Sequence, residues 1–220
     1  MATPPLRLHA ITLADAAHAQ VPADGSHTGT FAAVRDAIQF IPFRDLCAVV
    51  SDQKNFLPDE IAPADVELHR NVVDGIFRRT AVLPAPVGTV FRTAEVLTKW
   101  MELHYVSLMG ALEFVDDRAV ARVHVVRADG KAEDLETGSD LAAAAAESFR
   151  ALRRRAVAVV PLRLEQITGL VLSASFLVER DLWKEFLHAT EEQHDAHHHL
   201  RFDVTGPWAP YDFVRMQFGS

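Results

Sequence analysis

The residues whose spacing most suggests chemistry are four histidines near the end of the chain: His194, His197, His198 and His199. Spacings of three and four would place His194, His197 and His198 on one face of a helix, as a zinc or nickel site requires. Such a site also takes a ligand from a distant element and carboxylates that orient the imidazoles. The acidic neighbours of these histidines are equally typical of an ordinary helix end, so we expect no bound metal and no other cofactor.

The sequence contains no motif that is typical of nucleophilic catalysis or of acid–base catalysis by paired carboxylates. The chain has neither a Gly-x-Ser-x-Gly elbow nor a glycine-rich loop for phosphate. Ser173 and Ser175 lie in one apolar run and Cys47 in another, so we interpret all three as core residues. Asp116 and Asp117 are neighbours in the sequence and do not face each other on a helix. We therefore predict that the chain is not an enzyme and has no catalytic residue.

Composition limits the class of protein further. The 220 residues carry a formal net charge of −8, with 49% hydrophobic and 24% charged residues, which is ordinary for a soluble globular protein. The negative charge argues against nucleic-acid binding, and we interpret the arginines at 150, 153, 154 and 155 as a solvated helix end. A single cysteine excludes an intrachain disulfide and fits a reducing cytoplasm. No apolar run approaches the ~20 residues of a membrane-spanning helix, so we expect no membrane association.

The first part of the chain mixes strand and helix patterns. Alternation of apolar and polar residues predicts strands over 6–12 and 119–127, and an apolar run predicts a buried strand over 46–51. A further short strand, interrupted by prolines, is expected over 81–90. Helical periodicity predicts one helix over 64–80 and a long one from Thr93 to 115. The long helix has a broad apolar face, formed by Leu97, Trp100, Met101, Leu108 and Leu112.

The second part of the chain predicts a separate lobe. Its expected helices cover 141–157 and 179–196, and its expected strands cover 170–178 and 200–204. The charged, glycine-bearing stretch 128–140 is the best boundary. We therefore predict a two-lobed α+β protein, with an N-terminal ferredoxin-like domain over 1–128 and a smaller C-terminal α+β domain over 139–220.

A segment rich in proline and aromatic residues follows the last predicted strand. It reads Gly206-Pro207-Trp208-Ala209-Pro210-Tyr211. We expect Gly206 and Pro207 to end the strand, because proline has no N–H for the sheet. The segment resembles the C-terminal Gly-Pro-Trp-Pro-Pro-Tyr-x-Phe pattern of the gas vesicle protein F and L (GvpF/GvpL) family, from which Ala209 departs.

A second segment resembles the same family. His69 lies on the helix predicted over 64–80, and the chain continues through Leu83-Pro84 to Gly88-Thr89-Val90-Phe91. In the family, a helix carrying a histidine leads into a Val-Leu-Pro strand and a Gly-Thr-Val-Phe turn. Pro86 and Val87 stand where that pattern has arginine and phenylalanine. Two matches in the same order carry more weight than either alone.

The resemblance implies an accessory protein of gas vesicle formation in the cytoplasm. Its implied partner is the major gas vesicle shell protein (GvpA-like), a small and very apolar subunit that would aggregate before assembly, with other accessory proteins as further partners. It leaves open whether the chain assists assembly like a chaperone or stays at the vesicle surface as a minor component. The matched segments give the expected contact surfaces, either Leu83–Phe91 or the face with Trp208 and Tyr211.

Two alternatives from other classes stay open. One is a metal-dependent or small-molecule-binding enzyme that uses the cluster His194–His199. The other is a dimerising α+β module with no role in gas vesicles, which would associate with itself but not with the shell subunit.

Overall fold

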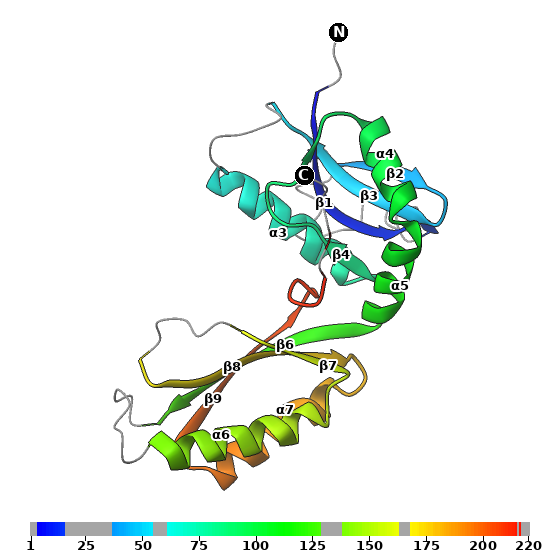
Figure 1. Cartoon of the computed structure of the whole chain (residues 1–220). Helices are drawn as coiled ribbons and strands as arrows, with labels where there is room; N and C mark the ends of the chain where they lie inside the picture. The colour runs from blue at the N-terminus through cyan, green and yellow to red at the C-terminus, as the bar shows by residue number, and fades with distance from the viewer. Residues whose placement is uncertain are drawn as a thin grey trace, which may run out of the picture. The chain divides into compact units, whose positions relative to one another are not determined.

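The structure is a computed structural model that describes residues 4–15, 37–54, 61–128, 138–162, 168–214 and 216. The chain divides into two compact units. The first unit comprises residues 1–116 together with 209–220, and the second comprises residues 117–208. Figure 1 follows their elements along the chain.

The first unit contains an antiparallel five-stranded sheet. Its strands are β1 (Leu6–Leu13), β2 (Gln39–Phe43), β3 (Leu46–Asp52), β4 (Val82–Pro84) and β5 (Val90–Phe91). Their order is β2-β3-β1-β4, and β5 also pairs with β1. A two-residue turn, Arg44-Asp45, joins β2 to β3, and Arg44 adopts a φ of 53° there.

Three helices accompany this sheet: α3 (Pro63–Phe77), α4 (Ala94–Leu103) and α5 (Tyr105–Val115). Pro63 starts α3, where its missing N–H costs no helical hydrogen bond. The hydroxyl of Thr93 caps α4 by accepting a hydrogen bond from the Val96 N–H. The single long helix predicted from Thr93 to 115 is wrong in one respect, because His104 leaves helical geometry and separates α4 from α5.

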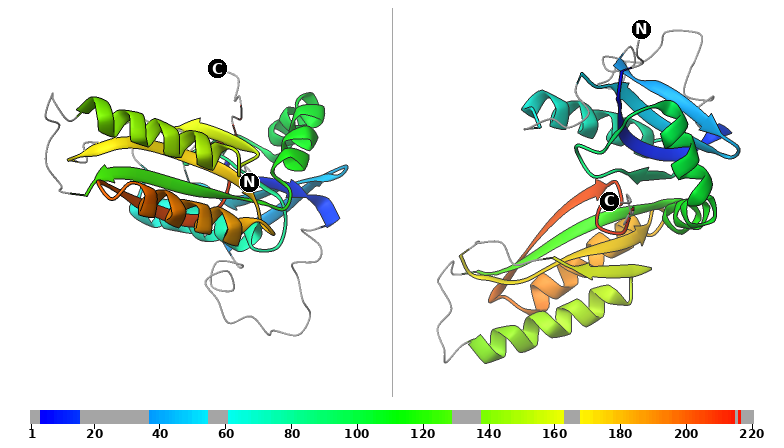
Figure 2. Two further views of the ribbon diagram at one scale, coloured as in Figure 1. Left: turned by 90° about the horizontal axis from the view of Figure 1, so that it is seen from below. Right: turned by 45° about the horizontal axis from the view of Figure 1, so that its top comes forward.

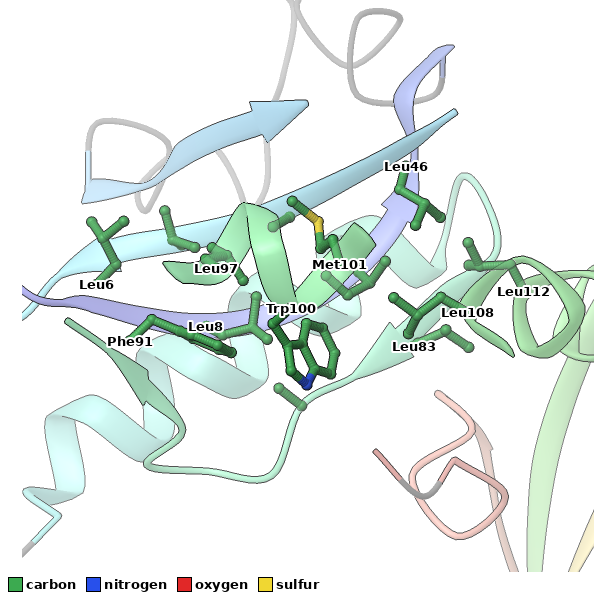
Figure 3. Close-up of a cluster of buried hydrophobic side chains, with 14 of the residues drawn as sticks. Leu6, Leu8, Leu46, Leu83, Phe91, Leu97, Trp100, Met101, Leu108 and Leu112 are labelled. Atoms are coloured by element: carbon green, nitrogen blue, oxygen red, sulfur yellow. The ribbon is translucent and has the colours of Figure 1, made fainter. Parts of the chain in front are cut away.

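The sheet of the first unit is covered on both faces. Alternate residues of β1 point to opposite sides, so Leu6 and Leu8 face α4 and α5 while Arg7 and His9 face α3. Figure 3 shows the apolar core on the α4–α5 side. The five residues predicted for the inward face of the long helix are buried in this core: Leu97, Trp100, Met101, Leu108 and Leu112.

The second unit contains an antiparallel four-stranded sheet and two helices. The strands are β6 (Arg118–Arg127), β7 (Ala158–Pro161), β8 (Leu170–Glu179) and β9 (Leu200–Trp208), and the helices are α6 (Gly138–Arg153) and α7 (Trp183–Ala196). The strand order is β7-β8-β6-β9. Both helices pack on one face of this sheet (Figure 2). Phe176 and Phe186 are buried in the core of this unit. The β-α-β-β-α-β succession and this order are those of a ferredoxin-like fold.

The first four strands of the first unit pair in the same order as the four strands of the second unit. β1, β2, β3 and β4 correspond to β6, β7, β8 and β9, and α3 corresponds to α7. The connection between β1 and β2 falls mostly on residues 16–36, outside the described part. The two-lobed α+β prediction is thus confirmed, and ferredoxin-like strand order occurs in the second unit as well as in the first.

The division between the units differs from the predicted one. The strand predicted over 119–127 is β6 and belongs to the second sheet, whereas residues 209–220 belong to the first unit. Most of the predicted boundary, 129–137, lies outside the described residues and connects β6 to α6 within one unit. The predicted helix over 141–157 is also too long, because its last residues lead into β7.

The last strand does not end at Gly206 and Pro207, contrary to the prediction. β9 continues to Trp208 through a cis Gly206–Pro207 peptide bond. The strand lies at the edge of its sheet, where a proline without an N–H is tolerated. Gly206 has a φ of 134°, and a Cβ there would lie 2.5 Å from the carbonyl oxygen of Val120. Only glycine fits this position without strain.

Candidate functional site

His69 is a buried residue on the sheet-facing side of α3. Its side chain is 1% exposed, and its ring lies 5.4 Å from that of His9 and 6.2 Å from that of Tyr211, measured between centroids. Tyr211 belongs to the part of the C-terminal segment that packs with the first unit. The two family segments therefore meet at this point of the first unit.

A polar network surrounds His69 beneath α3. Arg7 forms an ion pair of 2.6 Å with Asp65 of α3 and donates a hydrogen bond of 2.6 Å to the Gln53 side chain. His9 Nε2 lies 2.9 Å from the Ser51 hydroxyl. Because Arg7 is buried, the carboxylate of Asp65 compensates a charge that would otherwise be costly. The network fixes α3 against β1 and β3.

Both buried histidines are neutral at neutral pH. Burial, reinforced by the charge of Arg7, lowers the pKa of His69 to about 4. Burial, with the nearby His69 and Arg7, lowers the pKa of His9 to about 3. The hydrogen bond from Arg7 holds the pKa of Asp65 below its usual value. These groups hold the fold together and present no accessible acid or base.

The segment after His69 is also mostly buried. Leu83 and Pro84 lie in β4 and are inaccessible to solvent. Gly88 and Thr89 form a turn in which the Thr89 hydroxyl donates to the Pro86 carbonyl over 2.7 Å. Phe91 packs against Trp100, with 5.7 Å between ring centroids. Of this predicted contact surface, only the turn reaches solvent.

The C-terminal motif is divided between the two units. Gly206, Pro207 and Trp208 end β9 in the second unit, whereas Pro210 and Tyr211 belong to the first. Trp208 is 41% exposed, and its indole N–H donates to the Thr205 hydroxyl over 3.1 Å.

The histidine cluster does not adopt the predicted helical arrangement. α7 ends at Ala196, so His197 and the residues after it leave the helical face. His194 Nδ1 lies 3.1 Å from the Leu200 carbonyl, an ordinary contact at a helix end. Within the described residues no three histidine, cysteine or carboxylate side chains are placed to hold a metal.

Nucleophilic side chains are similarly placed for structure. Ser173 Oγ lies 2.9 Å from His124 Nδ1 on paired strands, but the backbone groups around it are engaged in the sheet. No free N–H groups therefore converge there to stabilise an oxyanion. Burial raises the pKa of the Cys47 thiol to about 11, which leaves it unreactive at neutral pH.

An exposed apolar surface lies on α4 and α5, and the sequence did not predict it. We call it the α4–α5 stripe and define it by Leu103, Val106, Gly110 and Phe114. Leu103 and Val106 are 82% and 83% exposed and flank the break between the helices. Val106, Gly110 and Phe114 are spaced by four residues and share one side of α5.

The sequence signal for this stripe is the composition of α5. Within Tyr105–Val115 the only charged residue is Glu113, so apolar residues occur on every side of the helix. Such a helix is either buried all round or meets another apolar surface. Leu108, Leu112 and Val115 are buried in the core, whereas Val106 and Phe114 remain exposed.

Comparison with known proteins places these features in a family. A family model described as "Gas vesicle synthesis protein GvpL/GvpF" matches residues 15–141 and 127–215. The chain belongs to the GvpL/GvpF family. It is 30% identical over 186 residues to gas vesicle protein F2 of Halobacterium salinarum, covering 82% of this chain and 81% of that protein. It is 29% identical over 208 residues to gas vesicle protein F of Streptomyces sp. (strain CB03234), covering 77% and 84%.

Solved GvpF structures share the fold. The crystal structure of GvpF from Anabaena sp. PCC7120 matches with a TM-score of 0.76 at 16% identity, covering 98% of this chain and 100% of that one. GvpF from Microcystis aeruginosa matches with a TM-score of 0.71 at 15% identity, covering 97% and 100%. The GvpL/GvpF family comprises gas vesicle accessory proteins and is not a known enzyme family. Among the described helices, none is long and apolar enough to cross a membrane.

Proposed function

We propose that this chain binds the apolar major shell subunit of gas vesicles (GvpA-like) in the cytoplasm through the α4–α5 stripe. Bound there, the subunit is kept soluble and delivered to the growing vesicle, with which the accessory protein then associates. Membership of a gas vesicle synthesis family supports the general role. The exposure of the stripe supports the specific contact.

The exposed leucine and valine carry this proposal. Leu103 and Val106 are the most exposed large apolar side chains in the described part of the chain. Each Å² of apolar surface removed from water contributes roughly 25 cal/mol, so covering them stabilises a complex. An apolar patch rimmed by polar residues is characteristic of an interaction site. Glu102 and Glu113 provide such a rim here.

The glycine at position 110 also supports the α4–α5 stripe as the contact surface. It lies between Val106 and Phe114 on α5, and a Cβ there would meet nothing within 4 Å. Glycine in a helix costs about 1 kcal/mol relative to alanine. Nothing in the described part of the chain explains that cost, since there is room for a side chain. A partner helix could use the bare backbone to approach closely between the two apolar side chains.

Side-chain contacts connect the turn between β2 and β3 to the start of α5, beside the stripe. The Arg44 guanidinium lies 5.2 Å from the ring centroids of both Phe43 and Tyr105. The Tyr105 hydroxyl donates a hydrogen bond to Asp45, which raises the pKa of the tyrosine. Because Tyr105 lies between Leu103 and Val106 in the sequence, these contacts fix the break between α4 and α5. Binding therefore requires little ordering of this region.

We assign the family-matched segments a supporting role rather than the main contact. The side chains of His69, Leu83 and Phe91 are buried and cannot touch a partner without unfolding. Trp208 is partly exposed but belongs to the second unit, whereas the elements of the stripe belong to the first.

A pull-down from cells that express both proteins tests this assignment. The variant Leu103→Ser/Val106→Ser is expected to retain at least tenfold less shell subunit than the wild type, a loss of about 1.4 kcal/mol or more. The matched control is Ile61→Ser/Val66→Ser, which changes two exposed apolar residues of the same unit. We expect this control and Trp208→Ala to retain the subunit. Equal retention by all four proteins would remove the stripe from the contact.

A further inference from the structure

The second unit has a pocket where the end of α6 comes close to the start of α7. Its volume is about 280 Å³, and it is open to solvent. Arg154 and Arg155, just after α6, line one side of it. Glu179 and Glu185 line the same pocket. The site thus combines charges of both signs and shares no residue with the α4–α5 stripe.

The charges around the pocket do not balance. Glu185 is matched by Arg155 at 4.0 Å, and Glu179 is matched by Arg118 at the same distance. Arg150, Arg153 and Arg154 are exposed, and no ion pair engages them within the described residues. Arg154 lines the pocket, and Arg150 and Arg153 in the last turn of α6 add two more positive charges without an ion pair among the described residues, in a chain whose net charge is −8.

Part of the pocket lining is apolar. Phe186, which is fully buried, Val157 and Leu182 contribute to this part, and the last two are 42% and 37% exposed. Exposure of these two apolar side chains to water is unfavourable in free energy, so a ligand that covers them gains binding free energy. A volume of this size accommodates one large side chain with its neighbouring backbone.

We propose that this pocket binds an acidic peptide segment of a second polypeptide, with one large apolar side chain inserted as an anchor. The anchor covers Val157 and Leu182. Carboxylates beside the anchor meet Arg153 and Arg154, whose guanidinium groups bind carboxylates in a bidentate manner. Charge complementarity selects the partner, and the apolar pocket fixes its register.

A nucleic acid fits this surface poorly. The arginines without an ion pair cluster at one point, at the end of α6, whereas nucleic-acid binding requires positive charge along an extended path. The arginines interpreted from the sequence as a solvated helix end are therefore assigned to protein recognition.

Binding of synthetic peptides to the purified full chain tests the proposal by fluorescence anisotropy. The probe is a short labelled peptide with one central leucine flanked by aspartates and glutamates. Two control peptides replace the acids by their amides or the leucine by serine. We expect saturable binding of the acidic probe that weakens with added salt, and binding at least about tenfold weaker for each control peptide.

Variants of the chain locate the binding site. Arg153→Glu/Arg154→Glu is expected to weaken binding of the acidic probe at least about tenfold. Arg70→Glu/Arg78→Glu makes the same change in net charge on exposed arginines of the first unit and is expected to change it less than about twofold. Leu182→Ser, at the N-cap of α7 where serine is favoured, should weaken binding several-fold without harming the helix.

Three results would overturn the proposal. They are a wild-type chain that does not bind the acidic probe saturably, an amide peptide that binds equally well, and equal losses in the two arginine variants. A DNA oligonucleotide that displaces the probe completely at equal concentration would also overturn it in favour of nucleic acid. None of these results bears on the α4–α5 stripe, because the two surfaces lie in different units.

Discussion

Among single residues, His69 belongs to the family pattern, and the structure shows that it is buried beneath α3. Among the described side chains, neither of its ring nitrogens has a hydrogen-bond partner, and the Nδ1 of His9 also lacks one. A buried imidazole without partners is destabilising and tolerates no added charge. The contact between these rings beneath α3 therefore makes the fold of the first unit sensitive to acid.

The lowered pKa values predict how stability depends on pH. In the unfolded chain both histidines titrate near 6.5, whereas the folded values are about 4 for His69 and about 3 for His9. At pH values between the folded and unfolded pKa values, the unfolded state binds more protons than the folded state. The free energy of unfolding is therefore highest above about pH 6.5 and falls as the pH decreases. Each histidine is expected to cost about 2 kcal/mol between pH 7.5 and pH 5.

Denaturant unfolding at the two pH values measures this effect. His69→Phe removes one titrating group while keeping an aromatic ring against Tyr211, so the pH-dependent loss should shrink by about half the histidine contribution. His198→Phe, at an exposed position after α7, should behave like the wild type. An unchanged pH dependence in His69→Phe would show that this residue does not titrate on unfolding.

At the scale of elements, α5 combines a structural face with a binding face. Leu108 and Leu112 face the core, whereas Val106, Gly110 and Phe114 share another side. The glycine weakens the helix without relieving any contact in the described structure. A glycine that lowers helix stability on an exposed apolar face fits a site where stability is exchanged for binding.

Gly110→Ala separates these two properties. The variant is expected to be more stable by roughly 0.5–1 kcal/mol, because alanine is the better helix former and its Cβ has room. Its affinity for the shell subunit is expected to fall several-fold, since the methyl group blocks the close approach. Thermal unfolding and a pull-down on the same preparation measure both quantities. Greater stability with undiminished binding would place the helix contact elsewhere on the stripe.

The sequence predicted most elements correctly but not what ends them. The periodicity of residues 94–115 continues across His104 without a glycine or proline, so the break between α4 and α5 had no local signal. The stripe was missed for a related reason. A helix that is apolar on all sides indicates burial, and only the packed structure shows which side is covered.

At the scale of the whole molecule, the two units share one strand order without a recognisable sequence repeat. Strand order depends on pairings between segments far apart in the chain, and these leave no local pattern. The charged stretch 128–140 predicts a boundary between domains, yet the chain there connects β6 to α6 within the second unit. Glycine and charge indicate a connection but not whether the connection leaves a domain.

The two proposed surfaces give the chain the properties of an adaptor. The first unit presents the apolar α4–α5 stripe, and the second presents a pocket beside uncompensated arginines. One surface selects an apolar partner and the other an acidic one. Their separation in different units allows each to be disabled alone, by Leu103→Ser/Val106→Ser or by Arg153→Glu/Arg154→Glu.

The first measurement to make is the soluble fraction of the major shell subunit, expressed with and without this chain. We expect the wild-type chain to increase the soluble fraction and to co-purify with the subunit, and Leu103→Ser/Val106→Ser to do neither while remaining folded. If the shell subunit stays insoluble and unbound in the presence of the well-folded wild-type chain, the proposed function is wrong.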